Sequence, residues 1–333
     1  MRFPGYDHEV SQRRGTDEER VFQTFRNYLE AICQWIEDLY PHPAGVASGL
    51  SLAVKSQAWR TTTPPGQKKL TKRAGEVLRN AWATEVLLNS PRLLGNDELI
   101  AFSNLWAPVQ GYYAVFHAIC ALEMIQSGGV GPSNHHAVLE IASSRVASGG
   151  SPFVVPWTAR VLGSEAAWRY EGFGLAPIDA AISNLSAPRI ENAPSLLALA
   201  LKTTRREQIN ERADGWRKGL TTVAGKPRKN LPTKTRNERA DKMRATTLFD
   251  LLWRLRTRSN YKEGDALLTG ALSPSDAANF HGALCDVVAS TLLIAEIYIA
   301  HLVGKAALLV CAEMVPVPSG LEETSVLKRL SLW

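Results

Sequence analysis

Apolar residues recur at a helical period over most of this chain, and alternation of apolar and polar positions is scarce. Such a period places one apolar stripe along a helix, so the pattern predicts an all-α fold. Segments rich in Gly, Pro and small polar residues separate the periodic stretches, as in "TTTPPGQ" from Thr61 and "LTGALSPSD" from Leu268. The predicted helices are Glu18–Leu39, Lys69–Leu88, Asn96–Ile125, His135–Val146, Leu196–Lys218, Lys234–Ser259 and Pro274–Val303.

The most apolar stretch, from Leu284 to Ala312, predicts a buried core helix and no membrane span. Four polar residues interrupt it: Asp286, Glu296, His301 and Lys305. They leave no uncharged run near the ~18 residues that a spanning helix needs. The N-terminal "MRFPGYDHEVSQRRGTDEER" lacks the apolar core of a secretion signal, and no cysteine lies in Cys-x-x-Cys spacing. We therefore expect a cytoplasmic protein with reduced thiols.

Positive charge is concentrated in one segment. From Lys202 to Arg244 there are 14 Lys and Arg against 5 Asp and Glu, while the whole chain has a net charge of only +6. A basic strip of this kind can gather phosphates. Alternatively these cations only solvate an exposed helix pair, because Trp216 is the one interleaved aromatic residue available for base stacking. The candidate nucleic-acid-binding residues are Lys226, Arg228, Lys229, Lys234 and Arg236.

Three arginines in "LWRLRTRSNYKEGD" divide between two faces of the predicted helix. Arg254 and Arg258 share a face with Asp250, whose spacing from Arg254 favours an ion pair, so this face is expected to be solvated. Arg256 instead lies at the edge of an aromatic face, where a guanidinium needs a partner. Two interpretations remain open: Arg256 stacks on Trp253 or Phe249, or it joins Asn260 in presenting donors to a phosphate.

Histidines supply the remaining candidate chemistry. In "PVQGYYAVFHAICALEMI", His117 shares an aromatic and apolar stripe with Tyr113, so it is either a hydrogen-bonded core residue or a functional group. His135 and His136 open the following predicted helix in "GPSNHHAVLEI". Adjacent helical residues point about 100° apart, unlike the i, i+4 pair of a helical metal site, so we expect no metal and no cofactor.

Two of these motifs resemble a known family. The run "GYYAVFHAICALEM" is similar to the Tyr-Tyr and Phe-His-Ala helix of the HEPN superfamily, the helical domains named for higher eukaryotes and prokaryotes nucleotide-binding. "LWRLRTRSNY" resembles its late helix, in which a leucine-aromatic pair precedes an arginine and an Asp-Tyr or Asn-Tyr pair follows. By this match Arg256 is the family arginine, and Asn260 and Tyr261 are the pair that follows it.

The resemblance implies a HEPN-like helical bundle over residues 96–305, with a basic helical insertion around 187–244. An additional N-terminal helical region, 1–95, and a C-terminal tail, 306–333, lie outside it. It further implies RNA as the ligand, a homodimer with neighbouring sites, and metal-independent RNA cleavage. Toxin and phage-defence roles, with a protein partner in such a system, are common in the family.

One departure from the family pattern leaves alternatives open. Active members carry a histidine shortly after the arginine, where this chain has Tyr261, Lys262 and Glu263. Tyrosine has an unperturbed pKa near ~10 and is a weak base at neutral pH, so His117 is the other candidate. Without a base, the protein would be a catalytically silent module that binds a nucleotide or a partner protein. A third alternative is a helical subunit whose basic strip docks an acidic partner.

Overall fold

The computed structural model describes residues 16–57, 59–132, 134–148, 151–173, 193–218, 220–221, 229–261 and 264–333. These residues are mostly helical, in agreement with the predicted class, and a small three-stranded sheet accompanies the helices. The principal helices are α1 (Asp17–Leu39), α2 (Val46–Ser56), α4 (Lys72–Asn89), α5 (Asp97–Ser103), α6 (Ala107–Ser127), α7 (His135–Ala147), α8 (Ala193–Lys218), α9 (Thr233–Asp241), α10 (Leu248–Tyr261) and α12 (Pro274–Val303). The shorter elements are α3 (Trp59–Thr62), η1 (Ser90–Leu94), α11 (Gly264–Thr269), α13 (Lys305–Ala312), η3 (Glu322–Thr324) and α14 (Val326–Ser331).

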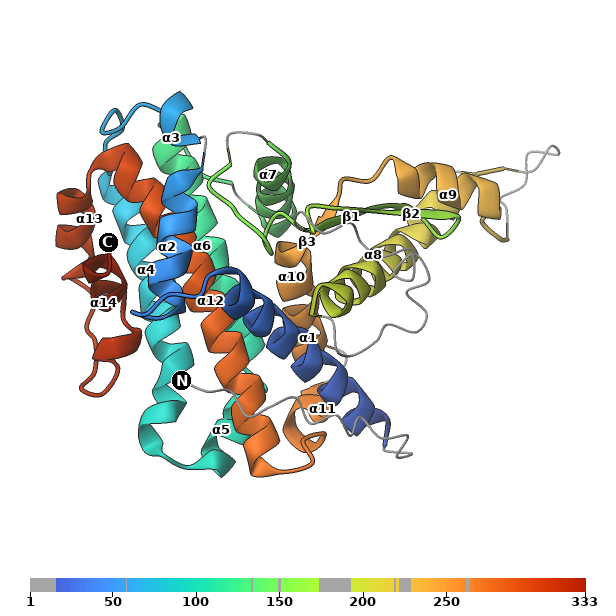
Figure 1. Ribbon diagram of the computed structural model, residues 1–333. Helices are drawn as coiled ribbons and strands as arrows, with labels where there is room; N and C mark the ends of the chain where they lie inside the picture. Colours follow the sequence, from blue (N-terminus) through green and yellow to red (C-terminus); the bar gives the residue numbers. More distant parts are fainter. Residues whose placement is uncertain are drawn as a thin grey trace.

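Helix α12 is the centre of the bundle. It begins at a Ser273 cap with Pro274 in its first turn and ends at Gly304, whose φ of 89° favours glycine, so both ends match the prediction. Within the described residues it is the one helix long and apolar enough to cross a membrane, but 83% of its most apolar window is buried in the protein. It packs against α1, α2, α4, α5 and α6, and Figure 1 shows it running through the middle of the molecule. It is therefore a core helix, as predicted.

Two of the predicted helices are each split in the structure. The segment predicted as Asn96–Ile125 breaks at Asn104, whose buried side chain donates to the Ala277 carbonyl at 2.9 Å. The segment predicted as Lys234–Ser259 breaks between Lys242 and Ala245 into α9 and α10. In both cases a contact from a distant part of the chain replaces the continuation of the helix, and periodicity does not report such contacts.

A β-hairpin that periodicity did not predict forms an arm with α8 and α9. Strands β1 (Arg160–Ser164) and β2 (Ala167–Glu171) pair antiparallel, and β3 (Thr246–Thr247) adds to the other edge of β1. Gly163 has a φ of 90°, and a Cβ there would lie 2.1 Å from the Ala167 carbonyl oxygen. Figure 1 shows the hairpin, α9 and the end of α8 extending away from the bundle. A second small core of Ile209, Ala240 and Met243 holds this arm together.

Arg205 of α8 is a buried residue that connects the elements of the arm. Its guanidinium is 0% exposed and donates to three carbonyl oxygens, those of Gly163 at 2.7 Å, Arg244 at 2.7 Å and Ala240 at 2.8 Å. Burial lowers the pKa of Arg205 to about 10, so the side chain stays charged at neutral pH. One residue therefore joins α8 to β1, to the end of α9 and to the chain that enters α10.

The C-terminal residues pack into the bundle. Arg329 of α14 donates to Glu85 of α4 and to Glu296 of α12, at distances of 2.6 to 3.0 Å, and Trp82 also donates to Glu296 at 2.9 Å. All three charged residues are at most 5% exposed. The main apolar core extends from Phe22 to Leu330 and so runs through the 1–95, 96–305 and 306–333 segments.

We predict that Arg329→Leu destabilises the protein by about 3 to 5 kcal/mol, because it leaves two buried carboxylates without their counterion. Burial already raises the pKa of Glu85 to about 7 despite the nearby Arg329. A carboxyl whose pKa is raised by folding lowers the free energy of unfolding of the protein as the pH rises above the pKa that this carboxyl has in the unfolded state. The destabilisation by Arg329→Leu should therefore grow between pH 5 and pH 8.

Urea unfolding at the two pH values measures this effect. The matched control is Lys328→Leu, because the Lys328 side chain is 40% exposed and its ion pair with Glu323 is worth about 1 kcal/mol or less. Equal losses in the two variants would contradict the structural role assigned to Arg329.

Candidate functional site

The Arg256 side chain lies where α10 packs against α6. Its guanidinium carbon is 4.7 Å from the centroid of the Trp253 ring and 5.7 Å from that of Tyr113, and Nη2 donates to the Tyr113 hydroxyl at 3.4 Å. The residue is 9% exposed. Stacking on Trp253 is thereby confirmed, whereas Phe249 packs against Phe153 at 5.3 Å. Stacking does not exclude an anion role, because a ring contacts the plane of the guanidinium, whereas an anion contacts its N–H edge.

His135 completes a cluster with Arg256. Asn134 caps α7 by accepting from the Ala137 amide at 2.9 Å, so His135 is the first residue of that helix. Its ring centroid lies 4.8 Å from Trp253 and 5.6 Å from Tyr113, the two rings that contact Arg256. Nδ1 of His135 is 3.2 Å from the Tyr112 hydroxyl. The fold thus brings a histidine from another helix to the aromatic rings that contact Arg256.

Electrostatics keep this histidine neutral. Burial and then the positive charge of Arg256 lower the pKa of His135 below its usual 6.5. Burial and then His135 lower the pKa of His117. Each histidine therefore has its lone pair at neutral pH, which is the state that a general base requires.

His117 lies one turn beyond Tyr113 on α6, with its ring centroid 6.0 Å from Tyr113 and 5.4 Å from Phe116. It belongs to the cluster, but its ring contacts run through Tyr113 and Phe116, whereas His135 contacts both ring partners of Arg256. Asn260 is exposed at the end of α10, and no hydrogen bond joins it to the cluster within the described part of the chain. The side chain of Tyr261 lies outside what the structure describes.

The prediction that Arg254, Arg258 and Asp250 form a solvated face is wrong. Asp250 is 0% exposed and accepts from Arg244 at 2.8 Å, from Gln208 at 2.7 Å and from the Thr247 amide at 2.9 Å. Arg254 lies 2.6 Å from Glu207 of α8, and Arg258 lies 3.0 Å from the same carboxylate. Helix α8 covers this face, so each predicted surface charge has a tertiary partner instead of an i, i+4 partner.

Three of the candidate nucleic-acid-binding residues, Lys229, Lys234 and Arg236, lie in the described residues and belong to the arm. Lys229 and Lys234 are exposed, while Arg236 pairs with Glu165 of the hairpin at 3.1 Å. Lys226 and Arg228 lie outside the described residues. Two of the 14 Lys and Arg residues counted in this segment, Arg205 and Arg244, make hydrogen bonds within the protein. The strip available to a ligand therefore carries less positive charge than the sequence count indicated.

Comparisons with family models, curated proteins and solved structures give no match to this chain. The HEPN resemblance therefore rests on sequence motifs alone. In the described part of the chain no group of three or more His, Cys, Asp or Glu residues is placed to hold a metal ion.

Arg254→Ala should destabilise the protein by about 2 to 3 kcal/mol, because it removes a charged hydrogen-bonding partner from a largely buried carboxylate. Thermal or urea unfolding measures the loss. Arg20→Ala is the matched control, since the Arg20 and Asp17 side chains of α1 are 61% and 85% exposed and such pairs are worth about 1 kcal/mol or less. A loss in Arg254→Ala no greater than in the control would restore the solvated-face interpretation.

Proposed function

We propose that the protein is an RNA-binding member of the HEPN class, and that its particular activity is metal-independent endonucleolytic cleavage of RNA. The observation that carries this proposal is the pairing of Arg256 with the neutral His135 across two shared aromatic rings. A cation for the phosphate and a base for the 2′-hydroxyl are the two groups that such cleavage needs. His135 takes the place of the histidine that the family pattern has after the arginine.

The proposed chemistry is an in-line displacement at phosphorus. His135 accepts the proton of the 2′-hydroxyl while the 2′-oxygen attacks phosphorus and the bond to the 5′-oxygen breaks. The 5′-oxygen leaves as a hydroxyl by taking a proton from water, His135 returns its proton to solvent, and a 2′,3′-cyclic phosphate remains. Arg256 stabilises the negative charge that develops on the phosphoryl oxygens. In the tautomer whose Nδ1–H donates to the Tyr112 oxygen, Nε2 of His135 carries the lone pair. Tyr112 then orients the base.

The surroundings of the pair suit single-stranded RNA. Trp253, Tyr113 and Phe116 are partly exposed, and aromatic side chains of this kind can stack on bases. The exposed Lys229 and Lys234 lie on the arm, where they can attract the phosphate backbone. A homodimer and a protein partner in a toxin or phage-defence system remain part of the proposal as the context that the family resemblance supplies.

A second candidate function is a catalytically silent module that binds a nucleotide or a partner protein. The low exposure of Arg256, 9%, favours it, because a guanidinium held between two rings has little area to offer a phosphate. If the protein binds RNA but does not cleave it, this second function is the correct one of the two.

We predict that the purified protein cleaves RNA in the presence of EDTA and leaves 2′,3′-cyclic phosphate ends. His135→Asn should lower the cleavage rate by about 10²- to 10⁴-fold, the usual contribution of a general base. Arg256→Lys should lower it by about 10²-fold, because the planar guanidinium fork is lost. Gel analysis of a labelled oligonucleotide measures both rates.

The controls are His136→Asn and Arg258→Lys, the neighbouring residues of the same types, with melting temperatures measured for all four variants. The rate of the native protein should fall with decreasing pH only below 6.5, because the pKa of His135 is lowered. Equal rates in His135→Asn and His136→Asn would exclude His135 as the base, and an unchanged Arg256→Lys would exclude the arginine.

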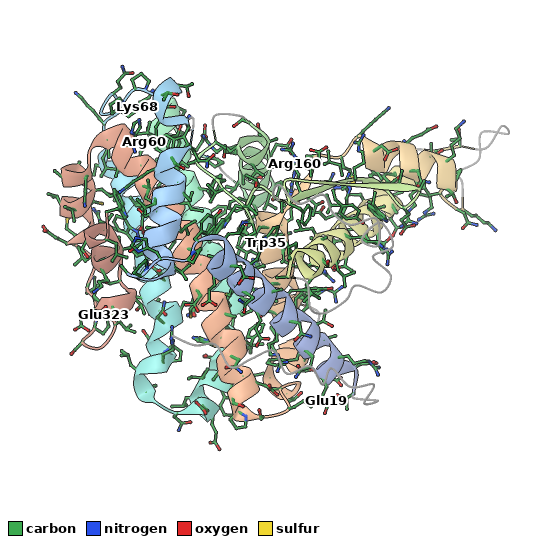
Figure 2. All side chains as sticks on the ribbon, in the orientation of Figure 1. Glu19, Trp35, Arg60, Lys68, Arg160 and Glu323 are labelled. Carbon is green, nitrogen blue, oxygen red and sulfur yellow. The ribbon has the colours of Figure 1, made fainter. Side chains whose placement is uncertain are left out.

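For the basic strip we predict a salt effect on single-stranded RNA binding. Each phosphate contact contributes about −0.7 to the slope of log affinity against log salt. Replacing Lys226, Arg228 and Lys229 by alanine should flatten this slope by about 2. The matched control replaces Lys68, Lys69 and Lys72, which are exposed, and Figure 2 shows Lys68 on the bundle, well away from the arm. A slope that does not differ between the two triple variants would leave the strip as solvated surface.

A further inference from the structure

One end of the bundle carries positive charge in a segment without acidic residues. Residues 40–75 contain six Lys and Arg and no Asp or Glu, and their charge equals the net charge of +6 of the whole chain. This segment covers α2, α3, the loop that follows and the start of α4. Figure 2 shows Arg60 and Lys68 at the same end of the molecule. We call its five exposed cations the basic end: Arg60, Lys68, Lys69, Lys72 and Arg73.

The loop between α3 and α4 is held against the C-terminal end of α12. Nε2 of His301 lies 2.7 Å from the Thr63 carbonyl oxygen. The Gly66 amide donates to the His301 carbonyl at 2.9 Å, and the Lys68 amide donates to the Leu302 carbonyl at 3.0 Å. The fold therefore sets the position of the backbone that carries these cations.

The cations of the basic end have almost no carboxylate partners. Within the described residues the one ion pair among them joins Arg73 to Glu76 at 3.4 Å, and the Arg73 side chain is 72% exposed. Lys55 and Lys305 are not part of the basic end, because their ammonium groups lie over the Trp333 ring at 5.1 and 5.0 Å. Even with Glu76 included, four positive charges remain without a counterion from the protein.

Two of these cations lie where helix electrostatics disfavour them. Lys72 and Arg73 are the first two residues of α4, and the first turn of this helix contains no acidic residue. The N-terminus of a helix carries a partial positive charge, which attracts anions and repels cations. An anionic surface in front of α4 would offset this repulsion.

The side chains favour lipid headgroups over other polyanions. Three of the five cations are lysines, and lysine is depleted in protein–protein interfaces, where arginine is enriched. Trp59 is buried, and residues 60–73 contain no aromatic side chain on which unpaired bases could stack. A layer of anionic headgroups instead attracts clustered Lys and Arg by charge alone.

We propose that the basic end binds reversibly to the surface of an anionic phospholipid bilayer. The exposed ammonium and guanidinium groups face the headgroup phosphates and carboxylates, and no apolar group enters the hydrocarbon. Because the charges are exposed, salt screens the attraction. The proposal is independent of the proposed RNA cleavage, since the basic end shares no residue with the Arg256 cluster or the arm.

Flotation of the full-length protein with vesicles tests this proposal. One set of vesicles contains phosphatidylcholine with about 30% phosphatidylserine, and the other contains phosphatidylcholine alone. The protein should float with the anionic vesicles at about 50 mM salt, should not float with the neutral ones, and should be released at about 500 mM salt.

Variants distinguish the basic end from the arm. Replacing Lys68, Lys69 and Lys72 by alanine should lower partition into the anionic vesicles by about 100-fold, the usual contribution of three basic residues. Replacing the same three by arginine preserves the charge and should preserve binding, which separates charge from a structural role. The matched control replaces Lys226, Arg228 and Lys229 of the basic strip by alanine and should float as the native protein does. Melting temperatures confirm that each variant is folded.

Four results would overturn the proposal. They are absence of flotation with the anionic vesicles, equal flotation with the neutral vesicles, unchanged flotation of the alanine variant of the basic end, and a loss confined to the control variant. A labelled RNA duplex gives the remaining comparison. If the native protein binds the duplex and the alanine variant of the basic end does not, the basic end serves RNA and the bilayer proposal is wrong.

Discussion

The buried carboxylate of Asp250 determines where the arginine helix begins. It accepts hydrogen bonds from Gln208, Arg244 and Thr247, and an unpaired carboxylate at 0% exposure would be costly, so these donors must assemble together. Their assembly ends the extended chain at Thr247 and starts α10 one residue later. The rotation of α10 about its axis follows from that start, and with it the direction of Arg256, two turns further on.

Helix α10 in turn joins the two chemical regions of the protein. One of its faces is covered by α8, where Glu207 receives Arg254 and Arg258, and another meets α6 and α7 at Tyr113 and His135. A rigid helix between a charged interface and an aromatic cluster holds Arg256 by packing on both sides. The proposed chemistry therefore depends on side chains from three helices, of which only one carries the arginine.

Sequence patterns were sufficient where the chain signals its own structure. Ser273, Pro274 and Gly304 set the ends of α12, and the period of its apolar residues gave its place in the core. The break before α10 was missed because Arg205 and Asp250 act across the fold, and the hairpin was missed because β1 and β2 are only five residues each. For the site, the choice of Arg256 came from its helical face together with the HEPN resemblance, whereas the role proposed for His135 requires the contacts between α7 and α10. Its position directly after the Asn134 cap, facing an aromatic helix, was the one signal available.

Arg205 also limits which substitutions the arm can tolerate. It donates hydrogen bonds to three backbone carbonyls at once, and a backbone carbonyl is still present after the side chain of its residue is substituted. A lysine at this position would have three donors on a single atom and could not reach carbonyls that lie on different sides of a guanidinium plane. No single compensating substitution in a partner is therefore available. Arg205 is therefore constrained by its contacts, while exposed residues of the arm such as Lys229 and Lys234 are not constrained in this way.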